Sequence, residues 1–427
     1  MLRLIYSLLL FLASPLILLR LLVRGLRQRG YWQNVGERWG RYSHGPLDNS
    51  LWIHAVSVGE MRAAQPLINR LRSNDPGCAI VVTCMTATGR EIARKLYAES
   101  VVCVYLPYDF FQLHRQFITH FRPSVLLIME TEVWPNLLAA CRAENVPALL
   151  VNARLSEKSR LGYARFAPVR ALTRAALRTL HAVAAQSAAD AERLASLGAR
   201  NILVTGNLKF DMPVDPLLVA RGRAWRRALD PGKQVFLAAS TRDGEEKLLI
   251  DAYRKRFTAD ERGALLLVLV PRHPQRFDAV HQLIQMAGFS VRRRSADETL
   301  AAGVDVWLGD SMGEMAAYVA MCDVAFIGGS LLPLGGQNLI EACAQGKPVI
   351  MGPSIYNFSD AARLAMEAGA MRQGDDADAV MAAAAELLQN EAMCESASRA
   401  AFAFASSHAG ATDRTMGLIA PLLNARV

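Results

Sequence analysis

Short apolar runs alternate with longer helical patterns along most of this 427-residue chain. Most of the runs are far enough apart to leave room for a crossover helix, which parallel strands require. A first series ends near residue 205 and a second begins near residue 235, with a polar segment, Gly206 to Pro216, between them. The expected strands are residues 51–56, 79–83, 101–106, 125–129, 148–152, 182–185 and 202–205, then 235–239, 265–270, 304–308, 324–327 and 348–351.

This alternation predicts an α/β protein with two Rossmann-like, doubly wound parallel-sheet domains that face a cleft. The length favours two or three domains rather than one core. We expect an amino-terminal anchor at residues 1–30, one Rossmann-like domain at 31–208 and a second at 209–427.

The amino-terminal segment is strongly apolar. Leu4 to Leu19 carries no charge and would span about 24 Å as a helix, short of the ~30 Å hydrocarbon core. The segment is followed by no A-x-A site and by an arginine-rich flank. Both features argue against its cleavage as a signal peptide. We expect an uncleaved anchor, either a short span or an interfacial helix, with a buried core helix as the alternative. The arginines that follow predict that the body stays on the cytoplasmic side.

The net charge of +9 is concentrated at the same end. The first 47 residues hold seven arginines and one acid, Glu37. Because this basic stretch follows an apolar helix, anionic lipid head groups explain it better than nucleic acid does. We therefore expect an anionic membrane surface as a partner, and no nucleic acid.

Several motif classes are absent from the sequence. The seven cysteines form no CxxC pair, which predicts buried, reduced thiols and neither a zinc site nor a disulfide framework. Neither half has GxGxxG after its first strand, and there is no P-loop, GxSxG or HExxH. A dinucleotide dehydrogenase and a P-loop NTPase are disfavoured, and we expect no metal and no cofactor.

Polar clusters follow the strands of the first half. Glu60 comes after the first strand, at the start of a helix, with Gly59 beside it to let a substrate approach. A carboxylate there is placed to act as a base, although it would equally complement the helix dipole. Similar clusters begin at Glu130, Asn152 and Gly206. Since parallel strands share one carboxyl edge, we expect these clusters on the same rim.

The second half repeats the pattern with hydroxyls, arginines and glycines. Ser240, Thr241 and Arg242 follow its first strand and suit an anion, although the hydroxyls would equally cap a helix. Further along the chain the glycines before Asn338 predict a phosphate site, and Glu341 one turn later could accept two ribose hydroxyls. A flexible loop with a surface glutamate is the alternative. The other polar turns are Pro271-Arg272-His273, Met312-Gly313-Glu314 and Gly329-Ser330.

At these residues the sequence resembles the 3-deoxy-D-manno-octulosonic acid (Kdo) transferases of lipid A biosynthesis, which have the GT-B glycosyltransferase fold. The resemblance covers nearly the whole chain. It departs from the family at Arg242 and Gln337, where histidine is frequent, and at Leu339-Ile340, where Pro-Leu is frequent. The motifs that carry it are residues 57–60, 129–136, 152–156, 206–211, 271–274 and 338–341, together with the anchor.

The resemblance implies transfer of Kdo from CMP-Kdo to a lipid A precursor, lipid IVA, with inversion at the anomeric carbon. It also implies a location on the cytoplasmic face of the bacterial inner membrane. Glu60 matches the general base, and Glu130 and Lys209 match positions that support the transition state. The candidate acceptor-binding residues are Ser57, Gly59, Arg62, Asn152 and Arg154. The candidate donor-binding residues are Ser240, Thr241, Arg242, Pro271, Arg272, His273, Met312, Gly313, Glu314, Gly329, Ser330, Asn338, Leu339, Ile340 and Glu341.

Two other functions remain open from the sequence alone. One is a GT-B enzyme on the same membrane that uses a UDP-sugar. The other is a non-catalytic nucleotide-sugar-binding or scaffolding protein, which would have no need of Glu60, Glu130 and Lys209 together.

Overall fold

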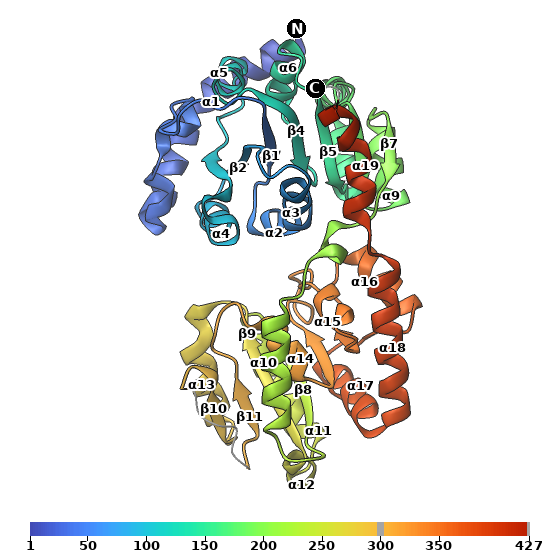
Figure 1. The fold of residues 1–427 in the computed structure, drawn as a ribbon. Helices are drawn as coiled ribbons and strands as arrows, with labels where there is room; N and C mark the ends of the chain where they lie inside the picture. The colour runs from blue at the N-terminus through green and yellow to red at the C-terminus, as the bar shows by residue number, and fades with distance from the viewer. Residues whose placement is uncertain (297–302, 425–427) are drawn as a thin grey trace. The chain divides into compact units, whose positions relative to one another are not determined.

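The computed structural model describes residues 1–296 and 303–424 and divides into two compact units (Figure 1). Unit 1 comprises Met1–Met212 and Ala409–Val427, and unit 2 comprises Pro213–His408. The division falls after Met212 rather than after Leu208, so Lys209 belongs to unit 1 and not to the start of the second domain. The segment after His408 also belongs to unit 1, whereas we had expected it in the second domain.

Unit 1 is built on a parallel sheet of seven strands in the order β3-β2-β1-β4-β5-β6-β7. The order reverses next to β1, because β1 pairs with β2 on one side and with β4 on the other. The strands are β1 Ser50–His54, β2 Ile80–Cys84, β3 Val102–Tyr105, β4 Pro123–Met129, β5 Ala148–Ala153, β6 Ala182–Ala185 and β7 Ile202–Val204.

Helices cover both faces of this sheet, so alternate residues of a strand enter different cores. Leu51 and Ile53 of β1 pack into one cluster, and Trp52 between them packs into the other. Helix α19 lies on the sheet although it ends the described chain (Figure 1). The helices are α1 Leu2–Arg27, α2 Val58–Ala63, α3 Gln65–Asn74, α4 Ala87–Tyr97, α5 Phe111–Phe121, α6 Pro135–Ala143, α7 Glu157–Arg165, α8 Ala167–Leu177, α9 Ala188–Ser196 and α19 Ala411–Asn424.

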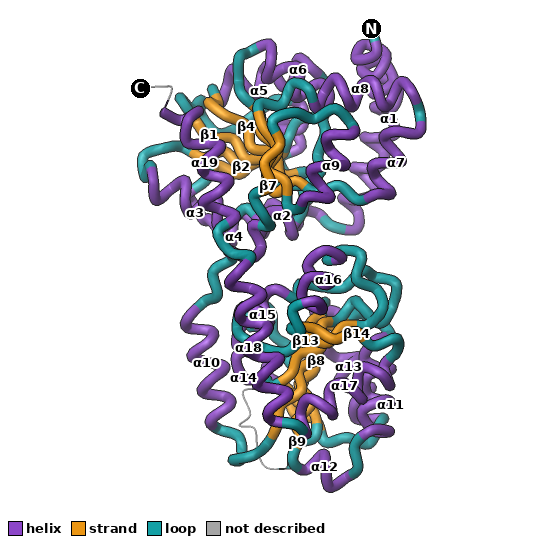
Figure 2. Tube along the Cα trace, turned by 90° about the vertical axis from the view of Figure 1, so that its right-hand side faces the viewer, coloured by secondary structure: helices purple, strands orange, loops and turns teal. Residues whose placement is uncertain are grey.

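Unit 2 repeats this architecture with a second seven-stranded parallel sheet, in the order β10-β11-β9-β8-β12-β13-β14 (Figure 2). Its strands are β8 Gln234–Thr241, β9 Leu265–Pro271, β10 Val291–Arg293, β11 Val306–Leu308, β12 Val324–Ile327, β13 Val349–Met351 and β14 Met371–Gln373. Its helices are α10 Pro216–Arg227, α11 Glu245–Arg256, α12 Ala259–Gly263, α13 Phe277–Met286, α14 Met315–Met321, α15 Ile340–Ala344, α16 Ser359–Glu367, α17 Ala377–Gln389 and α18 Glu391–Ser407.

All the expected strands are present, and the prediction of two doubly wound parallel-sheet domains is confirmed. The sequence missed β10 and β14, the two edges of the second sheet. Each has three residues, and charged or amide side chains such as Arg292 and Gln373 interrupt its apolar pattern.

The amino-terminal segment is helical, as expected. Residues Leu2–Leu26 form a helix long and apolar enough to cross a membrane, and none of its most apolar window is buried. The seven cysteines are free thiols, four of them buried.

Candidate active site

Glu60 lies at the first turn of α2, directly after the central strand β1. Its backbone N–H donates to the Ser57 hydroxyl at 3.3 Å, and its carboxylate accepts from that hydroxyl and from the Val56 N–H, both at 2.8 Å. Ser57 is therefore the N-cap of α2, and the Ser-x-x-Glu spacing forms a helix start that resembles a capping box. The helix-start interpretation of Glu60 is thus realised, and the same contacts fix its carboxylate in one orientation.

Burial, together with the negative charges of Glu130 and Glu132, raises the pKa of Glu60 to about 7, against the opposing effect of the hydrogen bonds from Val56 and Ser57. The side chain is 8% exposed. A carboxylate whose pKa lies near neutrality is matched to proton abstraction, since a base works best when its pKa is close to the working pH.

Glu130 follows the next central strand, β4, in a left-handed backbone conformation with φ of +59°. Such a conformation costs a non-glycine residue about 1 kcal/mol or more and persists where surrounding contacts enforce it. Here the Glu130 N–H donates to Val151 O at 3.0 Å, and the Lys209 ammonium donates to Glu130 Oε1 at 3.2 Å. The structure therefore brings Glu60, Glu130 and Lys209 together on one sheet edge, as the sequence predicted.

Asn152 is hydrogen-bonded to the segment that carries Lys209. It is fully buried and left-handed, with φ of +52°, and its Oδ1 accepts the Leu208 N–H at 2.9 Å. Leu208 opens the short 3₁₀ turn Leu208–Asp211 that presents Lys209. Asn152 thus acts on the position of Lys209, and its burial argues against the direct acceptor contact that we had expected.

Two arginines lie on the same half. Arg154 directly follows β5 and is half-buried. Arg62 projects from α2, and within the described residues its Nε is buried with no hydrogen-bond partner. A buried guanidinium N–H of this kind is suited to a phosphate oxygen.

In unit 2 a buried carboxylate, Glu245, joins two loops. It accepts the N–H groups of Arg242 at 2.8 Å, Gly329 at 2.6 Å and Leu331 at 2.9 Å. It thereby ties the loop after β8 to the loop after β12. No local pattern predicts this role, because Glu245 is one of two acids in the first turn of α11 and acids are common there.

Several expected donor contacts are occupied within the protein. Thr241 is buried and donates its hydroxyl to Glu246 at 3.1 Å, while Ser330 is buried and donates to Ile327 O at 2.6 Å. The side chains of Leu339 and Ile340 are buried as well. These side chains shape the loops, and only their backbone groups could meet a ligand.

Basic groups gather where β8 and β9 end. Burial lowers the pKa of His273, and the positive charges of Arg242 and Arg272 lower it further, so these three side chains lie near one another. The Arg272 N–H donates to Thr241 O at 2.9 Å, next to Ser240, which is left-handed with φ of +56°. Pro271 ends β9 and is buried. This is the edge on which a phosphate is expected.

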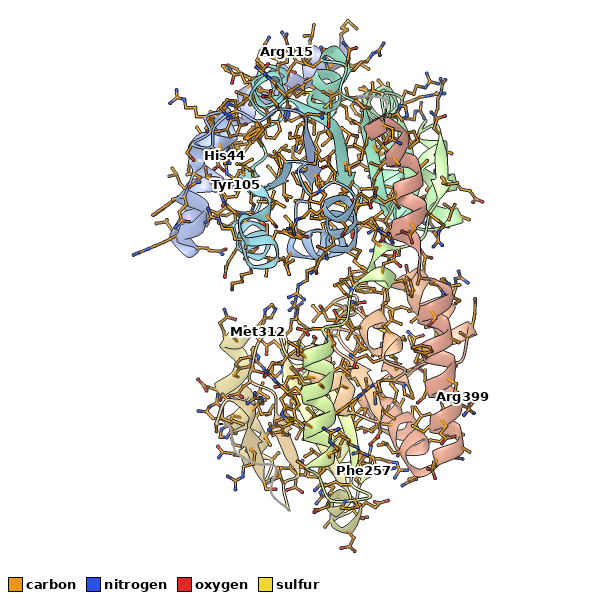
Figure 3. All side chains as sticks on the ribbon, viewed as in Figure 1. His44, Tyr105, Arg115, Phe257, Met312 and Arg399 are labelled. Carbon is orange, nitrogen blue, oxygen red and sulfur yellow. The ribbon has the colours of Figure 1, made fainter. Side chains whose placement is uncertain are left out.

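The Met312–Glu314 turn follows β11. Met312 is 55% exposed (Figure 3). Gly313 has φ of +86°, a conformation that requires glycine at this turn. Glu314 accepts from Arg221 at 2.7 Å and from Arg294 at 3.1 Å. The exposed Met312 side chain is available to a ligand, whereas Glu314 is held in an ion pair.

The glycines before Asn338 serve the protein's own packing. A Cβ on Gly335 would lie 2.4 Å from Asn357 Nδ2, and Gly336 has φ of +74° and donates its N–H to Gly329 O at 2.7 Å. Helix α15 begins at Ile340 and has five residues, so its dipole is weaker than we had expected for a phosphate site. Asn338 Nδ2 donates to Glu341 Oε1 at 3.4 Å, which orients that carboxylate.

No group of three or more His, Cys, Asp or Glu side chains that could hold a metal ion occurs among the described residues.

Comparisons with known proteins agree with this geometry. Residues 33–212 match a family model described as 3-deoxy-D-manno-octulosonic-acid transferase (kdotransferase). A 3-deoxy-D-manno-octulosonic acid transferase from Bordetella pertussis is 42% identical over 96% of this chain and 97% of its own length. The chain belongs to the Kdo transferase family. A second Kdo transferase, from Haemophilus influenzae, is 34% identical over the full length of both chains.

Kdo transferases are glycosyltransferases of lipid A and lipopolysaccharide-core biosynthesis and are associated with a bacterial membrane, which the apolar helix α1 fits. The fold also agrees. A UDP-GlcNAc 2-epimerase from Neisseria meningitidis superposes on 87% of this chain with a TM-score of 0.61 at 15% identity, which supports a GT-B-like architecture and nothing finer. The UDP-sugar and non-catalytic alternatives lose their support once the family is known.

Glu132 also lies near the site, within the motif of residues 129–136, and no role was expected for it. Burial raises its pKa, and its charge in turn raises that of Glu60. The sequence feature that could have indicated Glu132 is its position two residues after Glu130, in the same polar segment that follows β4.

Proposed function

We propose that this Kdo transferase moves Kdo from CMP-Kdo to a lipid A precursor, lipid IVA, with inversion of the anomeric centre and with Glu60 as general base. The observation that carries the assignment of Glu60 is its buried carboxylate, held by Val56 and Ser57 beside two further acids, with a pKa of about 7.

In the proposed reaction Glu60 takes the proton from a primary sugar hydroxyl of the acceptor. The freed oxygen attacks the anomeric carbon of Kdo from the face opposite the leaving phosphate, so the configuration inverts and CMP leaves. Lys209 pairs with Glu130, which holds its ammonium group in position. That ammonium group is proposed to stabilise a carboxylate or phosphate oxygen of the donor.

Unit 2 is proposed to bind the donor. Arg242, Arg272 and His273 form a basic edge for the phosphate of CMP, and Glu341, oriented by Asn338, accepts ribose hydroxyls. Because charge develops on the departing phosphate, fixed guanidinium groups there lower the barrier to transfer. The leaving group is then stabilised by protein side chains, and no metal or other cofactor takes part.

The acceptor's phosphates are proposed to contact Arg62 and Arg154 in unit 1. Lipid IVA is a membrane lipid, so we place the enzyme on the cytoplasmic face of the inner membrane, held by α1. The arginine-rich flank of that helix supports this side.

The function is tested by incubating detergent-solubilised protein with CMP-Kdo and lipid IVA, with and without EDTA, followed by mass spectrometry of the lipid. A mass gain of one or more Kdo units in both samples is expected. Gain only without EDTA would overturn the metal-free proposal. No gain, with folded protein and intact donor, would overturn the proposed substrates.

The pH dependence of transfer should report Glu60. The base must be ionised, so kcat is expected to fall as the pH drops below about 7. A plot of log kcat against pH should have a slope of one there, as expected for a single proton. Glu130→Gln removes the neighbouring charge that has the larger effect on the pKa of Glu60, and Glu132→Gln removes the one that has the smaller effect. Both variants should shift the acid limb to lower pH, Glu130→Gln by more. An acid limb that stays in place in both variants would contradict the assignment.

Gly59→Ala should separate folding from activity. Among the described residues, the one packing contact of an added Cβ would be Ser57 Oγ at 3.8 Å, so packing does not require glycine at this exposed position. We expect unchanged or slightly raised thermal stability, since alanine is the better helix former, and at least a tenfold loss of kcat/KM for the acceptor. Gly162→Ala, whose added Cβ would meet no atom of the described residues within 4 Å, is the matched control and should keep full activity. Full activity in Gly59→Ala would remove the proposed substrate approach at Gly59.

A further inference from the structure

Helix α1 is attached to unit 1 near both of its ends. At its start, the Tyr6 hydroxyl donates to Asp109 Oδ2 at 2.9 Å, and Ser7 exchanges hydrogen bonds with the amide of Asn136 at 3.0 and 3.3 Å. Asp109 is 3% exposed and Asn136 is fully buried, so these are contacts with the body of the unit. Arg3 stacks on Phe111 at 4.6 Å in the same region.

The far end is attached to the same side of the unit. The chain turns after α1, so that Trp32 packs against Gly25, where an added Cβ would lie 1.8 Å from Trp32 Nε1. The Gly30 carbonyl then accepts the Tyr105 hydroxyl at 3.1 Å (Tyr105 is labelled in Figure 3). Between the two ends, α1 packs against α6 and α8.

These two attachments are incompatible with a helix that crosses the bilayer. From Tyr6 to Arg27 a helix rises about 32 Å, as much as the ~30 Å hydrocarbon core, so a crossing would leave its ends on opposite faces. The helix also packs along its length on α6 and α8 of the unit, so a crossing would carry these helices and the buried Asp109 and Asn136 into the bilayer with it. Both ends of α1 therefore lie on the same side of any membrane.

The outward face of α1 is apolar along its whole length. The side chains turned toward the unit, such as Tyr6, Ser7 and Leu21, alternate at helical spacing with exposed ones. Exposed apolar residues occur on every turn of the helix, often as adjacent pairs: Leu4, Ile5, Leu8, Leu9, Phe11, Leu12, Leu16, Leu18, Leu19, Leu22, Val23 and Leu26. Exposed arginines, Arg20 and Arg24, flank this stripe, and no acid precedes Glu37.

We infer that α1 is an in-plane helix, whose outer stripe enters the acyl region of an anionic membrane surface while its inner face stays on unit 1. The charge of the flanking arginines matches anionic head groups, and the stripe is the kind that interfacial helices bury. Leu161 on α7, Phe166 between α7 and α8, and Val169 on α8 are also exposed. They lie beside exposed Arg165 and Arg170, and α8 packs against α1, so they continue this surface. The inference depends on membrane association and not on the reaction.

The membrane topology distinguishes this arrangement from a span. An epitope tag with a flexible linker is placed before Met1, and protease is added to right-side-out and to inverted inner-membrane vesicles. We expect tag and body to be digested together in inverted vesicles and protected together in right-side-out ones. Loss of the tag alone in right-side-out vesicles would show a crossing helix and overturn the inference, as would recovery of the chain in the soluble fraction. Detergent-solubilised protein, in which the tag must be cleaved, is the control.

A cross-link tests whether α1 stays on unit 1 in the membrane. Ser7→Cys with Asn136→Cys should be joined by a short bismaleimide, seen as a linked peptide by mass spectrometry. Leu8→Cys with Asn136→Cys is the matched control. It should give little cross-linked peptide, because Leu8 is 57% exposed on the outer face of the helix. Equal yields from the two pairs, or none from the first with both thiols reactive, would overturn the inference. Neither test needs turnover, so failure here and failure of the proposed reaction are separate results.

Discussion

Glu60→Gln is expected to lower kcat for Kdo transfer by about 10²- to 10⁴-fold, the usual contribution of a general base. Glutamine has the shape of glutamate, and its carbonyl oxygen can still accept the Val56 N–H that now bonds the carboxylate at 2.8 Å. It cannot take up a proton. The loss should therefore appear in kcat, measured as CMP release with lipid IVA, while CMP binding by calorimetry stays within about twofold.

Glu91→Gln is the matched control. Glu91 lies on α4 of the same unit, is solvent-exposed and pairs with Lys95 one turn away. Its loss should leave kcat unchanged, since exposed pairs of this kind contribute little. If Glu60→Gln keeps transfer within tenfold of the native enzyme, which is about 1.4 kcal/mol of barrier, Glu60 is not the base.

The fold could be predicted from the sequence because buried parallel strands leave a strong local signal. A strand such as Leu265–Pro271 is covered on both faces, so every residue is apolar and the run stands out. Edge strands lack that signal. Val291–Arg293 is half exposed and was missed for that reason. The return of α19 to unit 1 depends on long-range contacts, such as those of Asp211 with the N–H groups of Gly410 and Thr412, which no local pattern encodes.

The catalytic candidates could be predicted because they occupy a position that topology fixes. Glu60 and Glu130 follow neighbouring central strands, and parallel strands end on one edge, so their proximity follows from the strand assignment. What the sequence could not supply is the state of each side chain. The elevated pKa of Glu60 depends on burial and on two other carboxylates, and the left-handed backbone of Glu130 depends on tertiary contacts.

The loops after β8 and β12, by contrast, could not be assigned from the local sequence. Ser, Thr and Gly after a strand are equally typical of a phosphate site and of a loop that packs on itself, and here Thr241 and Ser330 do the second. The decisive contact is Glu245, whose bonds to Gly329 and Leu331 cross more than 80 residues of sequence. A side chain that organises two loops at that separation has no local signature.

Glu245→Ala is expected to be the most destabilising of the substitutions considered. It leaves three backbone N–H groups without their acceptor, that of Gly329 buried and those of Arg242 and Leu331 partly buried. A buried N–H group without an acceptor costs about 1–3 kcal/mol, and a partly buried one costs less. We expect a loss of about 4 kcal/mol from the free energy of unfolding of unit 2, seen as a fall in its melting temperature of roughly 10 °C. Glu395→Ala on the surface of α18, which removes an exposed pair with Arg399, should change it by less than about 0.5 kcal/mol.

The same substitution bears on function, because Glu245 holds together the two loops on which donor binding is proposed. CMP affinity should fall at least tenfold at a temperature where the variant remains folded, whereas the pH at which Glu60 ionises should not move, since Glu60 belongs to unit 1. Loss of stability with unchanged CMP affinity would mean that the nucleotide does not use the loops after β8 and β12. It would leave Arg272 and the turn after β9 as the proposed phosphate contact, and so would separate the part of the donor site that depends on loop architecture from the part that depends on charge.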